Sequence, residues 1–453
     1  MFGNPVCLQC IKAYSTATLL LTGRGKMRNT VLIILGMLLT GSLLAGEGVS
    51  FVRYRQYLQA ANMANQQGDH AAALEHYRKM LAMVPYNPGI HYLTAITYAR
   101  LEQPDDALAH LEQALKLGHE TGGKLDVVFD GLKEHSAFGR IERLMEMRQT
   151  PVNQSEVAFT IAERDLLPEG IAFDPKSESF FLGSLWKAKI IRIDAENQVS
   201  DFTTERQDGL RSVSGMEVDP RRRVLWALSF VAPPWPVPAP EENGWSGLFK
   251  YDLKTGKLLK KYVLHESGSP HLFNDLTVSR QGDVFLTDSL AGAVYALFHG
   301  KDELELYLRS DAFMLPNGIT LGEDETALYV TSSGVGVYRI DLQSKEYTLL
   351  RHPDFVSLCR IDGMYSHRNT LVCIQNGLNR IARVHLTPTG DAVEWLDIVE
   401  YGNPHFILPT TGVFVGDWFY YIANSQAYSV NRDGTLFPLE QLKEIVILKT
   451  KLP

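Results

Sequence analysis

The hydrophobic and polar positions of the chain repeat as one short pattern over its C-terminal two thirds. In each copy a polar residue, in most cases followed by a glycine, precedes apolar positions that alternate with others. The copy at 168–174 reads Pro-Glu-Gly-Ile-Ala-Phe-Asp. Such alternation is typical of a β-strand with one buried face. The polar positions of the six copies are Glu169, Ser214, Asn274, Asn317, Asp362 and Thr411.

These six positions lie 45, 60, 43, 45 and 49 residues apart. A period of about 40–50 residues with strand-like content indicates the blades of a β-propeller. The innermost strand of every blade faces one central channel. We therefore predict an all-β six-bladed propeller over 155–450, with the six polar side chains in one ring. The last copy lacks an outer strand of its own, so either 444–448 or 157–160 is expected to complete its blade.

The longest spacing contains an insertion at 231–240 with five prolines in ten residues. A segment so rich in proline is stiff and extended. It either lies near the channel mouth as a partial lid, with Trp235 or Trp245 facing a ligand, or runs over the surface away from the channel. The sequence leaves both hypotheses open.

A different period appears in 53–148. The pairs Ala73 and Ala107, Tyr77 and Leu111, and Met80 and Ala114 are each 34 residues apart. This spacing resembles the tetratricopeptide repeat, a pair of antiparallel helices that cross closely at small residues. Two repeats are recognisable, and a degenerate helical stretch from about residue 124 is expected to cap them. Such a domain is either a docking groove for a protein or peptide, or a helical spacer.

The N-terminal segment carries an apolar run at 31–45 behind Arg24, Lys26 and Arg28. This charge asymmetry is typical of a signal peptide or an uncleaved membrane anchor within 1–50. Either interpretation predicts an exported, periplasmic or membrane-anchored protein whose only membrane contact is this segment. The chain is thus predicted to be multidomain, with tetratricopeptide-like helical hairpins in 53–148 followed by the propeller.

Composition limits the classes of partner. The net charge is −8, and no basic block interrupts the body of the chain. Nucleic-acid binding would need a positive stripe, so we expect no nucleic-acid partner. Four cysteines are too few for a disulfide-built fold. Cys359 and Cys373 are expected to be free buried thiols.

The ring of polar side chains suggests metal chemistry. Glu169 and Asp362 would supply charge, while Asn274 and Asn317 would supply neutral carbonyl oxygens, which are the ligands that hard cations prefer. Ca²⁺ is the expected ion, with Mg²⁺, Mn²⁺ or Zn²⁺ as alternatives. A metal so held polarises a carbonyl group, and a carboxylate takes a proton from water. The other explanation is that Asn, Asp and Gly merely form turns at strand starts.

The motifs resemble those of the superfamily that contains gluconolactonase, senescence-marker protein (regucalcin) and luciferin-regenerating enzyme. The resemblance covers about 157–440, and it rests on Pro168–Gly170, Phe273–Asp275 with Gly282 and Thr287–Ser289, Pro316–Gly318 and Ile361–Gly363. It implies a six-bladed propeller with a divalent metal on Glu169, Asn317 and Asp362. It also implies metal or substrate contact by Asn274, and Asp362 as the base.

The chain departs from that family in two places. The sugar lactonases often carry Arg at the position of Leu272, so the resemblance by itself does not establish a sugar-acid lactone as the substrate. The related paraoxonases use a His where this chain has Ser214. His271 and His405 lie near ring motifs as further acids or bases, although such a His is more often structural.

Two functions remain open from the sequence. The first is a metal-dependent hydrolase of a small-molecule lactone or ester, with Asp362 as catalytic base. The expected substrate contacts in this case are Asn274, Ser214, Thr411 and His271. The second is a non-catalytic scaffold in the cell envelope, in which the propeller and the helical repeats bind protein partners.

Overall fold

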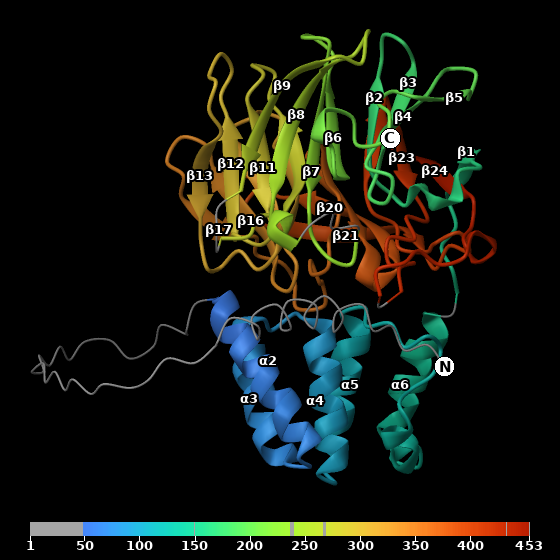
Figure 1. Ribbon diagram of the computed structural model, residues 1–453. Coiled ribbons are helices and arrows are strands. Elements are labelled where there is room, and N and C mark those ends of the chain that lie inside the picture. The colour runs from blue at the N-terminus through green and yellow to red at the C-terminus, as the bar shows by residue number, and fades with distance from the viewer. Residues whose placement is uncertain (1–48, 149, 236–239, 266–268, 432, 453) are drawn as a thin grey trace, which may run out of the picture. The chain divides into compact units, whose positions relative to one another are not determined.

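The computed structural model describes residues 49–148, 150–235, 240–265, 269–431 and 433–452 (Figure 1). The described helices and strands belong to one compact unit that begins at Val49. The predicted signal or anchor segment lies outside the described residues. Within the described ranges, no helix is both long enough and apolar enough to span a bilayer.

The N-terminal part of the described chain is helical, as predicted. Its elements are α2 (Phe51–Gln66), α3 (His70–Met83), α4 (Pro88–Arg100), α5 (Pro104–Lys116), the 3₁₀-helix η2 (Val127–Leu132) and α6 (Phe138–Met147). The side chains of Ser50, Asp69 and Asn87 cap α2, α3 and α4 by accepting backbone N–H groups that the first turn leaves unpaired. α2 packs on α3, and α4 packs on α5.

The repeat period is explained by burial between the helices. Ala73 and Ala107, one repeat apart, are both fully buried, as are Met80 and Ala114. The small side chains of Ala73, Ala107 and Ala114 let neighbouring helices cross closely. The predicted helical hairpins are therefore confirmed.

The remainder of the described chain forms six four-stranded antiparallel sheets. Blade 1 contains β2 (Pro168–Asp174), β3 (Ser179–Ser184), β4 (Ile190–Ile193) and β5 (Val199–Asp201); blade 2 contains β6 (Ser212–Asp219), β7 (Val224–Phe230), β8 (Ser246–Asp252) and β9 (Leu258–Leu264); blade 3 contains β10 (Phe273–Val278), β11 (Val284–Asp288), β12 (Ala293–Leu297) and β13 (Glu305–Arg309). Blade 4 contains β14 (Pro316–Leu321), β15 (Ala327–Ser332), β16 (Gly336–Asp341) and β17 (Tyr347–Leu349); blade 5 contains β18 (Met364–His367), β19 (Thr370–Gln375), β20 (Arg380–Leu386) and β21 (Val393–Tyr401).

The sixth blade joins the two ends of the propeller. It contains β22 (Gly412–Val415), β23 (Trp418–Ile422), β24 (Ile445–Lys451) and, on its outer edge, β1 (Glu156–Ile161). The sequence offered 444–448 and 157–160 as alternatives, but the structure uses both segments. β1 pairs with β24 from Glu156 opposite Lys449 to Ile161 opposite Ile445. This pairing closes the ring, because the strand that precedes blade 1 is hydrogen-bonded into blade 6.

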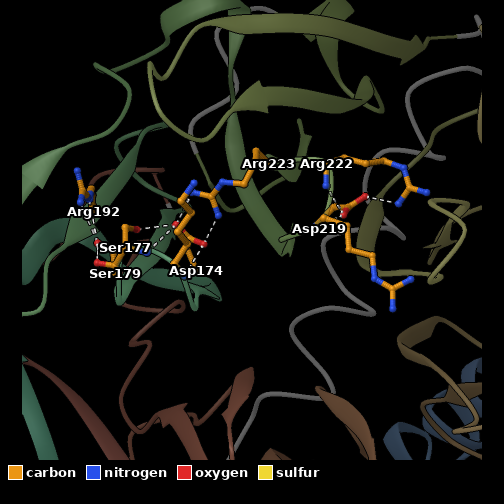
Figure 2. Close-up of polar contacts among 9 residues, drawn as sticks. Asp174, Ser177, Ser179, Arg192, Asp219, Arg222 and Arg223 are labelled. Carbon is orange, nitrogen blue, oxygen red and sulfur yellow. Dashed lines mark hydrogen bonds and ion pairs between the residues drawn. The ribbon is translucent and has the colours of Figure 1, made fainter.

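Charged turns tie blade 1 to blade 2 at the end of the channel away from the ring motifs. Asp174 is the last residue of the inner strand β2 and accepts two hydrogen bonds from the Arg223 guanidinium, at 2.5 and 2.7 Å (Figure 2). Burial opposes ionisation of Asp174, but the bonds from Arg223 and Ser177 keep the pKa of its carboxyl below the ordinary value. In blade 2 the corresponding Asp219 binds Arg222 at 2.9 Å.

The two cysteines in the described residues are free and buried, which confirms the prediction for Cys359 and Cys373. Cys373 lies in β19 opposite Met364. Burial raises the pKa of the Cys373 thiol to about 12, so it is protonated at neutral pH.

Candidate functional site

The six polar positions of the sequence pattern lie at the starts of the six innermost strands. Glu169, Asn274 and Asn317 occupy the second positions of β2, β10 and β14, and Ser214 occupies the third position of β6. Thr411 directly precedes β22, and Asp362 lies two residues before β18. Hydrogen bonds connect these positions around the channel. The Ser214 hydroxyl donates to the Phe273 carbonyl at 2.9 Å, the Asn317 amide to Asp362, and the Thr411 hydroxyl to the Glu169 carbonyl. The fold therefore brings the predicted ring together.

A shift in strand register directs these side chains. In blades 1 to 4 the pairing between the first two strands is interrupted, for example between Pro168 and Ile171 and between Pro316 and Ile319. The interruption leaves the ring residue and the following residue outside the ladder. A bulge of this kind bends the strand and redirects a side chain. The side chain of the ring residue therefore does not follow the alternation of faces that the paired residues of its strand obey.

The glycines after the ring residues are required by the close approach of neighbouring blades. A Cβ atom on Gly170 would lie 2.1 Å from the Ser214 carbonyl oxygen, and one on Gly318 would lie 2.5 Å from the Asp362 carbonyl oxygen. Both neighbours are backbone atoms, which cannot turn aside as a flexible side chain can. The glycine in the motif thus sets the diameter of the ring.

We expect Gly170→Ala to destabilise the protein strongly, because the new methyl group would overlap the backbone of blade 2. Overpacking of this type costs about 1–3 kcal/mol or more. Gly131→Ala is the matched control, since a Cβ atom there meets nothing within 4 Å. Thermal unfolding monitored by circular dichroism measures both. Equal stability of the two variants would show that the blades are not in contact at the ring.

Asp362 is the most closely bound carboxylate of the ring. It is 7% exposed, and it accepts hydrogen bonds from Asn317 Nδ2 at 2.5 Å and from Asn376 Nδ2 at 2.7 Å. Burial raises the pKa of Asp362 to about 7, although these two bonds oppose the shift. A carboxyl group with a pKa near neutrality exchanges protons readily at physiological pH, as a general base must.

Glu169 differs from Asp362 in its surroundings. Among the described residues, no hydrogen-bond donor reaches its carboxylate, and its side chain is half-buried. Burial, together with the negative charges of Asp362 and Asp275, raises the pKa of Glu169 well above the ordinary value. The site thus gathers carboxylates without a cationic side chain to balance them.

Asn274 and its neighbour Asp275 form the blade-3 part of the ring. Asn274 Nδ2 donates to Ser289 Oγ at 3.0 Å, and the Ser289 hydroxyl in turn donates to the Pro316 carbonyl at 2.6 Å. Asp275 is 6% exposed and accepts the backbone N–H of Leu276 at 2.9 Å. Burial raises the pKa of Asp275 to about 7, and the charge of Asp362 adds to the shift.

Sequence reasoning missed Asp275 as a site residue. The signal was present, because the other five copies of the motif carry glycine at this position (Gly170, Gly215, Gly318, Gly363 and Gly412). Asn376 was also missed. It lies in the turn after β19, 14 positions after Asp362, and nothing in the local sequence indicates that its amide reaches the ring.

The predicted substrate contacts have varied surroundings. Ser214 is 1% exposed and Thr411 6%, and the hydroxyl of each donates to the backbone of the next blade. His271 is 2% exposed, and its Nδ1 lies 2.5 Å from Asp288 while its Nε2 has no partner. His405 is exposed. A substrate role for these residues stays a prediction.

Apolar side chains from four blades form a buried cluster next to the ring motifs in the sequence. The buried cluster comprises Leu167, Leu185, Phe230, Ala232, Leu272 and Ala427. Trp235 packs against it, and its indole N–H donates to the Ala427 carbonyl at 3.0 Å. The start of the proline-rich insertion therefore runs from blade 2 to the long β23–β24 connection of blade 6. Trp245 instead contacts Arg211 and Phe249, away from this cluster.

The donor set of the ring suits a hard cation. All of its predicted ligand atoms are oxygens, on Glu169, Asn274, Asn317 and Asp362. Among the described residues, no cationic side chain offsets the negative charge of Glu169, Asp275 and Asp362. In the described part of the chain, no group of three or more His, Cys, Asp or Glu side chains forms a metal cluster. A metal here would thus depend on the amide oxygens as well as on the carboxylates.

One comparison with known protein families agrees with the helical repeats. Residues 64–121 match the family model described as tetratricopeptide repeat. No curated protein matches the chain.

Solved structures similar to this chain include several propeller enzymes. A gluconolactonase from Xanthomonas campestris is 13% identical, with a TM-score of 0.46, over 67% of this chain and 98% of its own. A luciferin-regenerating enzyme is 14% identical, with a TM-score of 0.46, over 67% and 96%. An aldose sugar dehydrogenase from Streptomyces coelicolor, solved with bound PQQ, is 12% identical, with a TM-score of 0.47, over 66% and 99%. These proteins differ in chemistry, so the function has to be argued from the site.

Proposed function

We propose that this protein is a metal-dependent hydrolase of a lactone or ester. The observation that carries the proposal is the oxygen-rich ring at the channel mouth. In it Glu169 has no hydrogen-bond donor among the described residues, and Asp362 has a pKa of about 7. A purely structural turn residue would not leave a half-buried carboxylate such as Glu169 without a hydrogen-bond donor, because burying an unpaired charge is costly.

The metal would be held by Glu169, Asn274, Asn317 and Asp362. Ca²⁺ is the first candidate on ligand type, with Mg²⁺, Mn²⁺ or Zn²⁺ as alternatives. When bound, it would polarise the carbonyl group of the substrate. The like-charge repulsion between Glu169, Asp275 and Asp362 favours a cation in their midst.

Asp362 acts as the general base in this proposal. Its two amide partners, Asn317 and Asn376, bind one carboxylate oxygen each and so fix the plane of the group. Each oxygen keeps a further lone pair for a water molecule or a metal. The carboxylate takes one proton of the attacking water as the water oxygen bonds to the carbonyl carbon. The acyl C–O bond of the lactone or ester then breaks, and the departing alkoxide takes the proton back from Asp362, which gives a carboxylic acid and an alcohol and restores the carboxylate. Ser214, Thr411 and His271 are proposed to contact the substrate.

We further propose export or membrane anchoring through residues 1–50, on the charge pattern of that segment alone. The alternative function is a scaffold that binds protein partners. The match of residues 64–121 to the tetratricopeptide repeat favours it, because such repeats are used for docking.

The experiment that tests the proposal combines elemental analysis of the purified protein with a panel of lactones and esters. One divalent ion per chain and metal-dependent turnover of a panel member are expected. Bound metal without turnover of any lactone or ester would favour the scaffold.

Metal affinity is expected to rise with pH between about 6 and 8. Below its pKa of about 7 the Asp362 carboxyl is protonated, so the metal has to displace a proton, whereas above that pH it does not. Each proton released adds about tenfold in affinity per pH unit. Isothermal titration calorimetry with Ca²⁺ at several pH values, in buffers of different ionisation enthalpy, measures the affinity and the protons released. A flat profile with no proton release would contradict the assignment of Asp362 as a ligand.

A further inference from the structure

The helical domain binds the segment of the propeller that leads into Asp362. The backbone carbonyl of Tyr86, in the loop between α3 and α4, accepts hydrogen bonds from Ser357 Oγ at 3.0 Å and from Cys359 Sγ at 3.6 Å. The Asn87 amide donates to the Gly334 carbonyl at 3.0 Å. Ser357 is 1% exposed, Cys359 is fully buried and Asn87 is 5% exposed. This contact is therefore a packed interface and not a loose surface contact.

Blade 5 holds the same segment from the opposite side. Gln375, at the end of β19, donates to the carbonyls of Ser357 and Cys359 at 3.0 and 2.7 Å. The buried Arg380 donates to Gln375 Oε1 at 2.6 Å and to the Ser357 carbonyl at 3.2 Å. The backbone of 357–359 is thus enclosed between the α3–α4 loop and β19–β20.

At the end of β19, two consecutive residues contact both the enclosed segment and the Asp362 carboxylate: Gln375 binds the segment, and Asn376 binds Asp362. Asn376, which donates to Asp362 Oδ2, directly follows Gln375. Arg360 lies between this turn and the start of α4. A Cβ atom on Gly377 would meet Arg360 Cδ at 2.5 Å, and one on Gly89 would meet Arg360 Nη2 at 3.2 Å. Contacts therefore run without a gap from α4 through Arg360 to the turn that orients Asp362.

We propose that the helical domain is a positioning element for the reaction. Its α3–α4 loop and the start of α4 fix residues 357–362 and, through Arg360, the amide of Asn376 on Asp362. This inference rests on the proposed function only in so far as Asp362 is the base. The physical reason is that a displacement of about 1 Å at a reacting group can cost about 100-fold in rate. The helical domain accordingly helps to hold Asp362 in place for the reaction. A helical spacer or an independent docking module would have no such effect on Asp362.

Two substitutions on the propeller side test this role. Arg360→Ala removes the side chain between Gly89 and Gly377, and Ser357→Ala removes the hydroxyl group that donates to Tyr86. Arg360→Lys is the conservative variant, since it keeps most of the aliphatic stem. Tyr401→Phe is the matched control, because it removes only the hydroxyl group that binds Glu120 of the helical domain at 2.8 Å and keeps the strand pairing of Tyr401 with Arg380.

Hydrogen–deuterium exchange of the full chain is the first measurement. The Asp362 N–H donates to the Ile374 carbonyl at 2.8 Å, and the Gly363 N–H donates to the Thr410 carbonyl at 3.0 Å, so both amides are protected. We expect faster exchange in the peptide containing 357–363 for Arg360→Ala and Ser357→Ala, with blades 1 and 2 unchanged. Tyr401→Phe is expected to match the wild type in this peptide.

Steady-state kinetics on the lactone or ester identified by the panel is the second measurement. We expect kcat to fall about tenfold or more in Arg360→Ala with KM nearly unchanged, partial recovery in Arg360→Lys, and no loss in Tyr401→Phe. Unaltered exchange in 357–363 and unaltered kcat would overturn the inference, as would an equal loss of kcat in Tyr401→Phe. If the wild type turns over no substrate, the proposed function fails, while exchange alone still decides whether the helices hold this segment.

Discussion

Asp362→Asn is expected to abolish most of the turnover while the protein stays folded. The substitution keeps the size of the side chain and one oxygen, but removes the negative charge that accepts a proton from water. Positioned general bases contribute about 10²–10⁴-fold to rate, and a loss of that order is expected in kcat. Metal affinity should fall less than turnover, because an amide oxygen still faces the ring.

The structure adds a detail to this expectation. Both oxygens of Asp362 accept amide N–H groups, from Asn317 and Asn376. In Asp362→Asn, the new NH₂ group would face the NH₂ group of either Asn317 or Asn376. That asparagine would have to flip its side-chain amide so that its oxygen accepts the new N–H. The control is Ser214→Ala, a ring position without charge, which should lose far less activity. Wild-type kcat in Asp362→Asn would remove the base assignment.

Glu169→Gln is expected to weaken metal binding by roughly 10²-fold or more, because a ligand of full charge becomes neutral in a buried site. The carboxylate has no hydrogen-bond donor among the described residues, so its replacement breaks no hydrogen bond of the fold. The folded protein without metal should even gain stability near neutral pH. Burial and like charges raise the folded-state pKa of Glu169, so ionisation destabilises the fold as pH rises above the unfolded-state value.

Glu217→Gln is the matched control for that experiment. Burial also raises the pKa of Glu217, to about 8, so glutamine resembles the protonated form that prevails at neutral pH. Its side chain interacts with Thr277 and is not among the proposed ligands. Calcium titration of the two variants beside the wild type should separate them. Identical affinities in Glu169→Gln and the wild type would place the metal elsewhere.

The architecture was predictable from the sequence because repetition is visible without a structure. The spacing of the ring motifs gave the number of blades, and the 34-residue period of Ala73 and Ala107 gave the helical hairpins. The ring positions were predictable for the same reason, since equivalent positions of a cyclic array have to meet at its axis. The strands that close the ring were predicted only in part, because either 444–448 or 157–160 alone would have completed the last blade, whereas the structure uses both.

The sequence by itself therefore determined the two kinds of repeat and the residues that face the channel. Only the tertiary structure decided how these residues are supported. Asn376 on Asp362 and the α3–α4 loop on Ser357 are contacts between segments that no local period links. Periodicity reports which face of a strand or helix is buried, whereas a single hydrogen bond across blades or domains depends on where the packed chain places two atoms. That placement is set by the close packing of the whole fold, so it appears only in three dimensions.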